Sequence, residues 1–207
     1  MNEDKIYKHL RTERLDITEA DGTLKLSLFN GTNVAPLMMD GVDLLPGHRQ
    51  GQGIAGMIFY NSQGDECGGM SLTSQRTAEG IYQAGLSMTF DQYKQDQVLQ
   101  MIMQIQGDQS MYGFRVYDRP ETHIKETVAA VLTMRASDDP TEKERIMAPI
   151  RAKSNLRLMI GKQHDGSVGL HIYDQDGRVR IRISLDAEDN PHLEMLDASG
   201  TVVATLV

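Results

Sequence analysis

The fold is decided by Asp174-Gln175-Asp176-Gly177-Arg178-Val179-Arg180-Ile181-Arg182-Ile183-Ser184-Leu185, near the end of the chain. After the turn, apolar side chains alternate with arginine and serine at period two, as on a β-strand with two different faces. The runs 168–173, 192–196 and 201–207 alternate similarly. Together they predict an antiparallel meander with one polar face. On that face Arg178, Arg180 and Arg182 are expected to pair with Glu194 and with Asp186 or Asp189, or alternatively to bind an anion.

Five polar turns that close on glycine repeat along the chain. They are Glu19–Gly22, Asn61–Gly64, Gln163–Gly166, Asp174–Gly177 and Asp197–Gly200. Glycine accepts the positive φ that such a hairpin turn needs, and Asp or Asn at the first position can accept a hydrogen bond from the backbone two residues on. Calcium binding is the alternative, but the alternating ligands and acidic last residue of a calcium loop are missing. The repeat therefore predicts hairpins.

The first half of the chain follows the same pattern. Leu24, Leu26 and Leu28 share one face of a predicted strand, and further strands are expected at 55–60, 69–73, 84–90, 97–106 and 111–117. Between them, residues 30–53 are rich in Gly and Pro and predict a long loop.

The period changes between residues 118 and 153. Asp118 followed by Glu121 fits a capping box, and apolar residues then recur at helical spacing. Asp139 before Pro140 predicts the start of a second helix, which Pro149 should kink or end early. We expect a helical hairpin inserted between a β part at 15–117 and a C-terminal β meander at 154–207, all within one domain spanning 1–207.

Composition narrows the function classes. A net charge of −8 speaks against nucleic-acid binding through phosphates. With Cys67 as the only cysteine, neither an intrachain disulfide nor a cysteine-based zinc site can form. His171 and His192 could pair across strands but lack a third ligand, and the sequence has no phosphate loop or dinucleotide fingerprint, so we expect no metal and no cofactor. The charged residues 1–10 do not resemble a signal peptide, and no run is long enough to span a membrane. We therefore expect a cytoplasmic protein.

Candidate ligand- or partner-binding residues gather at turns between the central strands. They are Asp65, Glu66, Asp91, Tyr93 and Asp96. Polar groups on turns of a rigid sheet are well placed to meet a ligand, although solvated turn carboxylates are the simpler interpretation. A catalytic alternative uses Glu66 and Asp91 as the acid and base of a carbohydrate-active hydrolase or lyase. Cys67 is expected to be structural, because neighbouring carboxylates raise a thiol pKa.

Four segments carry a resemblance to a family of uncharacterised bacterial β-rich proteins. They read GMIFYN at Gly56–Asn61, GDECGG at Gly64–Gly69, FDQYKQDQ at Phe90–Gln97 and YDRP at Tyr117–Pro120, followed by the C-terminal ladder of D-x-x-G hairpins. The resemblance covers most of the chain. It implies a shared architecture and brings no reaction, ligand or cofactor with it.

The sequence thus predicts a mainly β fold of about a dozen short antiparallel strands, as a barrel or stacked sheets, with one helical hairpin. The predicted function is a non-catalytic binding or assembly module with a protein or carbohydrate partner. Self-association is expected, because an unclosed meander leaves strand edges uncovered. The competing hypotheses are the hydrolase or lyase above and a β-barrel that carries a small apolar ligand.

Overall fold

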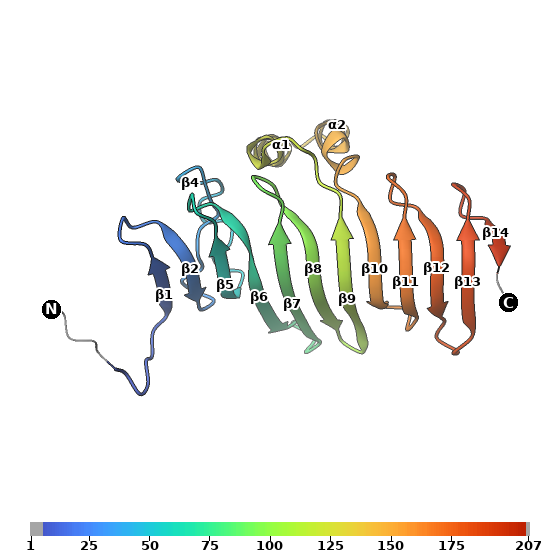
Figure 1. Cartoon of the computed structure of the whole chain (residues 1–207), viewed down its shortest axis with the longest axis horizontal. Helices are drawn as coiled ribbons and strands as arrows, with labels where there is room; N and C mark the ends of the chain where they lie inside the picture. The colour runs from blue at the N-terminus through green and yellow to red at the C-terminus, as the bar shows by residue number, and fades with distance from the viewer. Residues whose placement is uncertain (1–5, 206–207) are drawn as a thin grey trace.

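The computed structural model describes residues 6–205 and has the form of one broad sheet with two helices at one end of its central strands (Figure 1). The charged residues 1–5 and the last two residues of the predicted strand 201–207 lie outside the described part. In spatial order the strands of the main sheet are β1 (Arg14–Thr18), β2 (Leu24–Phe29), β5 (Ala55–Tyr60), β6 (Glu66–Arg76), β7 (Tyr82–Asp91), β8 (Gln97–Gln106), β9 (Gln109–Tyr117), β10 (Leu156–Lys162), β11 (Val168–Tyr173), β12 (Val179–Leu185), β13 (Pro191–Leu196) and β14 (Val202–Thr205).

The sheet is a meander in which each strand pairs antiparallel with the next one in the order. Two longer connections interrupt it. The segment between β2 and β5 contains a small hairpin, β3 (Met38–Met39) and β4 (Val42–Asp43), and the segment between β9 and β10 contains α1 (Ile124–Ala136) and α2 (Pro140–Arg151). The predicted mainly β fold with a helical hairpin is confirmed. Within residues 6–205 the main sheet is open, since β1 and β14 lie at its two ends (Figure 1).

The predicted hairpin turns are confirmed. In all five, the N–H of the first residue donates to the carbonyl of the fifth, and the N–H of the closing glycine donates to the carbonyl of the first. The closing glycines have φ between 78° and 91°. In the Asp174 and Asp197 turns, the carboxylate accepts from the backbone two and four residues on. Asp186–Asp189 forms the same turn with Asp189, at φ 65°, in place of glycine.

The helices begin differently from each other. Asp139 caps α2 as predicted, accepting a hydrogen bond from the Thr141 N–H at 2.8 Å. The capping box predicted at Asp118 is wrong, because α1 begins at Ile124 and its cap is His123, whose Nδ1 accepts from the Lys125 N–H. Asp118 instead pairs with Arg157 of β10. The helix α2 continues for two residues beyond Pro149 and ends at Arg151, so the proline does not end it at its own position.

The two faces of the sheet differ in what covers them. The segment between β2 and β5 folds over one face, where Val34 and Ala35 pack with Phe29, Ile58 and Tyr60 to form the buried cluster. This covered side also carries serine, threonine and glutamine, and we call it the polar face. The opposite side carries the alternating apolar residues and is called the apolar face. No helix in residues 6–205 has the length and apolar character needed to cross a membrane.

Candidate functional site: a carboxylate-lined cavity on the polar face

A cavity of about 420 Å³ lies between the polar face of the sheet, the segment 30–53 and α1. Its apolar wall is formed by Met39, Ile54 and Ile58 on one side and by Ile124, Val128 and Val131 of α1 on the other. Its polar wall comes from the central strands and the turn after β7, with hydroxyl, amide and carboxyl side chains: Glu66, Ser87, Thr89, Asp91, Gln95, Asp96, Gln97 and Gln100. The cavity therefore combines an apolar wall with convergent polar groups, as small-molecule sites do.

Glu66, the first residue of β6, is held by Arg49 of the covering segment. Arg49 donates to both carboxylate oxygens, with Nη1 to Oε2 at 2.9 Å and Nη2 to Oε1 at 2.7 Å. The two side chains are only 18% and 11% exposed. This bidentate pair fastens the covering segment to the sheet, and it leaves neither oxygen of Glu66 without a partner.

Asp91, the last residue of β7, is the unusual group of the cavity. Burial raises the pKa of this carboxyl to about 7, and the negative charges of Glu66 and Asp96 add to the effect. Among the described residues, none donates a hydrogen bond to its side chain and none forms an ion pair with it. Asp91 is thus a carboxyl in a cavity, close to half-protonated at neutral pH and without a protein partner.

The turn after β7 brings Asp96 to the same cavity. Asp96 accepts from the Gln97 N–H at 2.9 Å, and Arg119 lies 3.7 Å from its other oxygen. Gln95 is 3% exposed and links the turn to the segment before α1, since its amide donates to the Thr122 carbonyl at 2.9 Å while its oxygen accepts from the Asp96 N–H. The turn after β7 is therefore held in place by hydrogen bonds of Gln95 and Asp96.

Asp65 and Tyr93 lie outside the cavity lining. Asp65 is fully buried and accepts from the Asp40 N–H at 2.6 Å and from Lys94 at 2.6 Å. Lys94 also pairs with the Asp40 carboxylate, so these charges join the covering segment to the turn after β7. Tyr93 is 66% exposed, and its hydroxyl donates to Gln63 at 3.0 Å. The structure thus brings Glu66, Asp91 and Asp96 together and separates them from the other two predicted residues.

Sequence reasoning missed several residues of this cavity. No sequence pattern could identify Arg49 as a residue of this cavity, because its partner Glu66 lies 17 positions away and the intervening segment has no periodic pattern. Ser87 of β7 and Gln100 of β8 are diagonal neighbours on the polar face, and the Gln100 amide donates to the Ser87 hydroxyl at 2.9 Å. The alternation along β8 already places Gln100 on the face opposite to Met101, and the alternation along β7 places Ser87 opposite to Met88, but only the pairing of the two strands brings the two side chains together.

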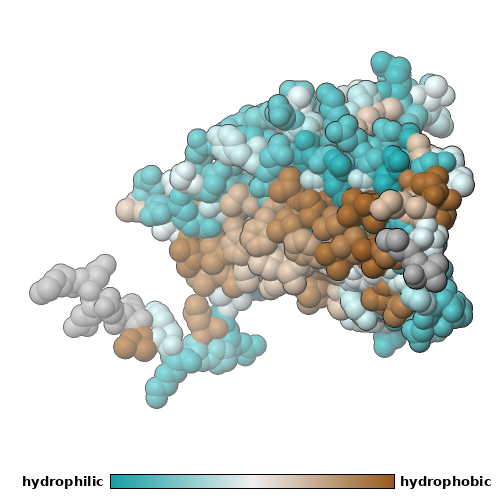
Figure 2. All heavy atoms as spheres, turned by 45° about the vertical axis from the view of Figure 1, so that its right-hand side comes forward, coloured by the Kyte–Doolittle hydropathy of each residue, from teal (hydrophilic) through white to brown (hydrophobic). Residues whose placement is uncertain are grey.

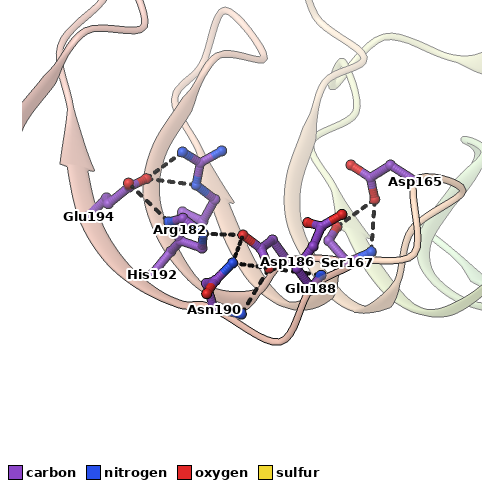
Figure 3. Close-up of polar contacts among 8 residues, drawn as sticks. All are labelled: Asp165, Ser167, Arg182, Asp186, Glu188, Asn190, His192 and Glu194. Atoms are coloured by element: carbon purple, nitrogen blue, oxygen red, sulfur yellow. Dashed lines mark hydrogen bonds and ion pairs between the residues drawn. The ribbon is translucent and has the colours of Figure 1, made fainter.

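The C-terminal polar face carries a second set of charges (Figure 3). Arg182 of β12 donates from Nε to Glu194 of β13 at 2.8 Å, as the cross-strand interpretation predicted. Asp186 does not pair with an arginine, and instead lies 3.1 Å from Nε2 of His192. The charged groups of the C-terminal polar face therefore find their partners on neighbouring strands.

The Cys67 thiol has a raised pKa. Burial is the largest cause, and the negative charges of Asp91, Glu66 and Asp65 add to it. Within residues 6–205 no cluster of three His, Cys, Asp or Glu side chains is arranged to hold a metal ion.

Comparison with models of known protein families and with curated proteins returned no match to this chain. The resemblance to a family of uncharacterised β-rich proteins therefore stays a prediction.

Proposed function

We propose that the protein is a non-catalytic binding module that takes up a small hydroxyl-bearing molecule, carbohydrate in class, in the cavity between the segment 30–53, the sheet and α1. The observation that carries the proposal is the unpaired Asp91 carboxyl, which faces a cavity of about 420 Å³ whose volume lies in the small-molecule range. The Asp91 side chain is partly accessible in the cavity, and a ligand hydroxyl there would supply a hydrogen bond that no described residue provides.

The remaining wall supports this ligand class. Hydroxyl and amide groups of Ser87, Thr89 and Gln97 offer neutral donors and acceptors of the kind that sugar hydroxyls meet. The C–H face of a sugar ring would pack on the apolar wall formed by Ile58, Ile124 and neighbouring residues. Near neutral pH the Asp91 carboxyl can either donate or accept, because its pKa is raised to about 7.

The binding hypothesis is favoured over the hydrolase or lyase alternative by the state of Glu66. A glycosidase acid must deliver a proton and its partner must attack or activate water, so both carboxyls need a free oxygen. Arg49 engages both oxygens of Glu66, so the predicted Glu66/Asp91 pair lacks a second free carboxyl. We expect no release of nitrophenol from nitrophenyl glycosides at any pH between 5 and 8.

Isothermal titration calorimetry with a panel of neutral mono- and disaccharides tests the proposal. We expect at least one sugar to bind, and Asp91→Leu to weaken that binding by about 10-fold or more, the equivalent of one or two lost hydrogen bonds. Asp176→Leu is the matched control, because Asp176 lies in an exposed C-terminal turn and should leave affinity unchanged.

Two results would contradict the proposal. Binding of small organic amines without any sugar would change the ligand class, since the cavity holds more carboxylates than arginines. Sugar binding that Asp91→Leu leaves intact would place the ligand elsewhere.

A further inference from the structure

The apolar face of the sheet is continuous from one edge to the other. Successive cross-strand partners form an uninterrupted row of apolar side chains across eleven strands: Leu15, Leu28, Met57, Met70, Met88, Met101, Phe114, Ile160, Leu170, Ile183 and Leu193. We call this the methionine row, because four consecutive strands contribute methionine to it.

A second row runs beside it across all twelve strands. Its members are Ile17, Leu26, Phe59, Gly68, Phe90, Leu99, Val116, Leu158, Ile172, Ile181, Met195 and Ala204. Neither row contains a charged or hydrogen-bonding side chain. Figure 2 shows hydrophobic residues gathered in one band that is bordered by hydrophilic residues above and below.

Nothing in residues 6–205 covers this face. The segment 30–53 and α1 contact the polar side, where the buried cluster and the cavity lie. Large apolar side chains of the two rows consequently remain open to solvent, including Phe90 at 46%, Met101 at 56%, Ile183 at 49% and Met195 at 50%. Monomeric proteins rarely leave a contiguous apolar patch of more than a few hundred Å² exposed.

The area is sufficient for a stable dimer. Twelve strands spaced about 4.8 Å apart span about 53 Å, and two to three side-chain rows on one face add about 14 to 20 Å in the other direction. Each copy could therefore bury on the order of 700 to 1,000 Å², and the pair about twice that, which lies in the range of specific protein interfaces.

A second copy of the chain also suits the chemistry of the face. The net charge of −8 would make two copies repel each other, but neither row carries any of that charge, so the copies can meet through an uncharged surface. The same negative charge opposes adsorption to anionic lipid. At the middle of the sheet, across β6 to β10, an apolar hollow of about 480 Å³ is lined by residues that include Met88, Met101, Tyr112, Phe114 and Ile160. Side chains of a facing sheet would fill this hollow.

From these observations we propose that the protein is a homodimer in which two sheets pack face to face through the apolar face. A two-fold axis near Met101 and Phe114 would superpose the centre of each methionine row on that of the other. The two sheets would lie about 10 Å apart with strand directions within about 30° of each other. This proposal is independent of the ligand cavity, which lies on the opposite face.

Sedimentation velocity from low micromolar to millimolar concentration tests the proposal with two variants of the same strand. Met101→Glu places two like charges near the axis, and we expect it to raise the dimer dissociation constant on the order of 100-fold. Gln104→Glu adds the same charge at an exposed position of β8 on the polar face, and the dimer should persist. Circular dichroism establishes that both variants are folded.

A second measurement needs no substitution. Oxidation by hydrogen peroxide should be slow at Met57, Met70, Met88 and Met101 when the protein is dimeric, and should accelerate on dilution below the dissociation constant.

Three outcomes would overturn the proposal. A wild-type monomer at millimolar concentration with rapidly oxidised row methionines would exclude a dimer. A dimer that Met101→Glu leaves intact, or that Gln104→Glu disrupts equally, would place the interface elsewhere, with the edges β1 and β14 as the other surfaces for pairing. A monomer that binds neutral phosphatidylcholine vesicles through this face would identify a lipid surface as its partner.

Discussion

The N-terminal and C-terminal parts of the sheet use the same strands and turns but differ in how they are held together. From β2 to β9, the polar face is covered by the segment 30–53 and α1, and most of the fully buried apolar side chains are there. From β10 to β14, the polar face carries cross-strand ion pairs such as Arg182 with Glu194, and only Met159 and Leu196 are buried apolar residues. The N-terminal half therefore depends on burial within the chain, whereas the C-terminal half depends more on strand pairing and cross-strand ion pairs.

The largest expected difference between the two halves comes from core truncation. Ile58 is 7% exposed in the buried cluster, so Ile58→Ala should lower the free energy of unfolding by about 3 to 4 kcal/mol. Ile183 is 49% exposed on the apolar face, and Ile183→Ala should cost the monomer about 1 kcal/mol or less. Urea unfolding at a concentration where the protein is monomeric measures both. If both variants lose the same free energy of unfolding, burial within the chain does not make the N-terminal half more dependent on its core.

Ion pairs should also contribute more to stability in the N-terminal half than in the C-terminal half. Arg49→Met leaves Glu66 largely buried without its bidentate partner, and we expect a loss of about 3 kcal/mol. Arg182 is 37% exposed, so Arg182→Met should cost less than about 1 kcal/mol. The double variant Arg49→Met with Glu66→Gln should recover part of the larger loss in urea unfolding. If it recovers nothing, the contribution of Arg49 lies in packing and not in charge.

The pH dependence of stability should originate in the N-terminal half. The pKa of Asp91 is raised to about 7 in the folded protein, above its ordinary value, so the folded state binds more protons than the unfolded state between those two pKa values. Stability should consequently fall as pH rises from 5 to 7, with a slope of at most about 1.4 kcal/mol per pH unit.

Urea unfolding of Asp91→Asn between pH 5 and 8 measures the contribution of this group. The variant should lose most of the slope and should be more stable than the wild type at pH 8. An unchanged slope would assign the pH dependence to another group. One candidate is His192 in the C-terminal half, whose pKa is raised by its hydrogen bond to Asp186.

The smallest effect concerns the one turn of the C-terminal meander that lacks glycine. Asp189 has φ 65°, a conformation that glycine adopts without strain. Asp189→Gly should therefore stabilise the protein by less than about 1 kcal/mol, whereas Gly200→Ala, at φ 85° in the next turn, should destabilise it by about 1 kcal/mol. Thermal unfolding of the two variants measures these changes. A destabilising Asp189→Gly would mean that the Asp189 side chain contributes more than its backbone strain costs.

The sequence predicted most of the strands and the turns, because alternation and glycine-closed bends are local properties of the chain. It failed at Asp118, where a capping pattern was present but the side chain pairs with Arg157 across β9 and β10. The same limit applies to the site. Glu66, Asp91 and Asp96 were identified from clustering at turns, but Arg49 and the wall of α1 could not be, since they reach the cavity from distant segments.

By itself, the sequence determined that the body is pleated, where it turns and which residues of each strand share a face. Only the tertiary structure decided that the sheet stays open, that the segment 30–53 covers one face, and that the other face is left as an apolar surface twelve strands wide. The physical reason is that side-chain alternation and turn geometry act over a few residues, whereas the pairing of strands and the burial of a face depend on contacts between segments far apart in the chain.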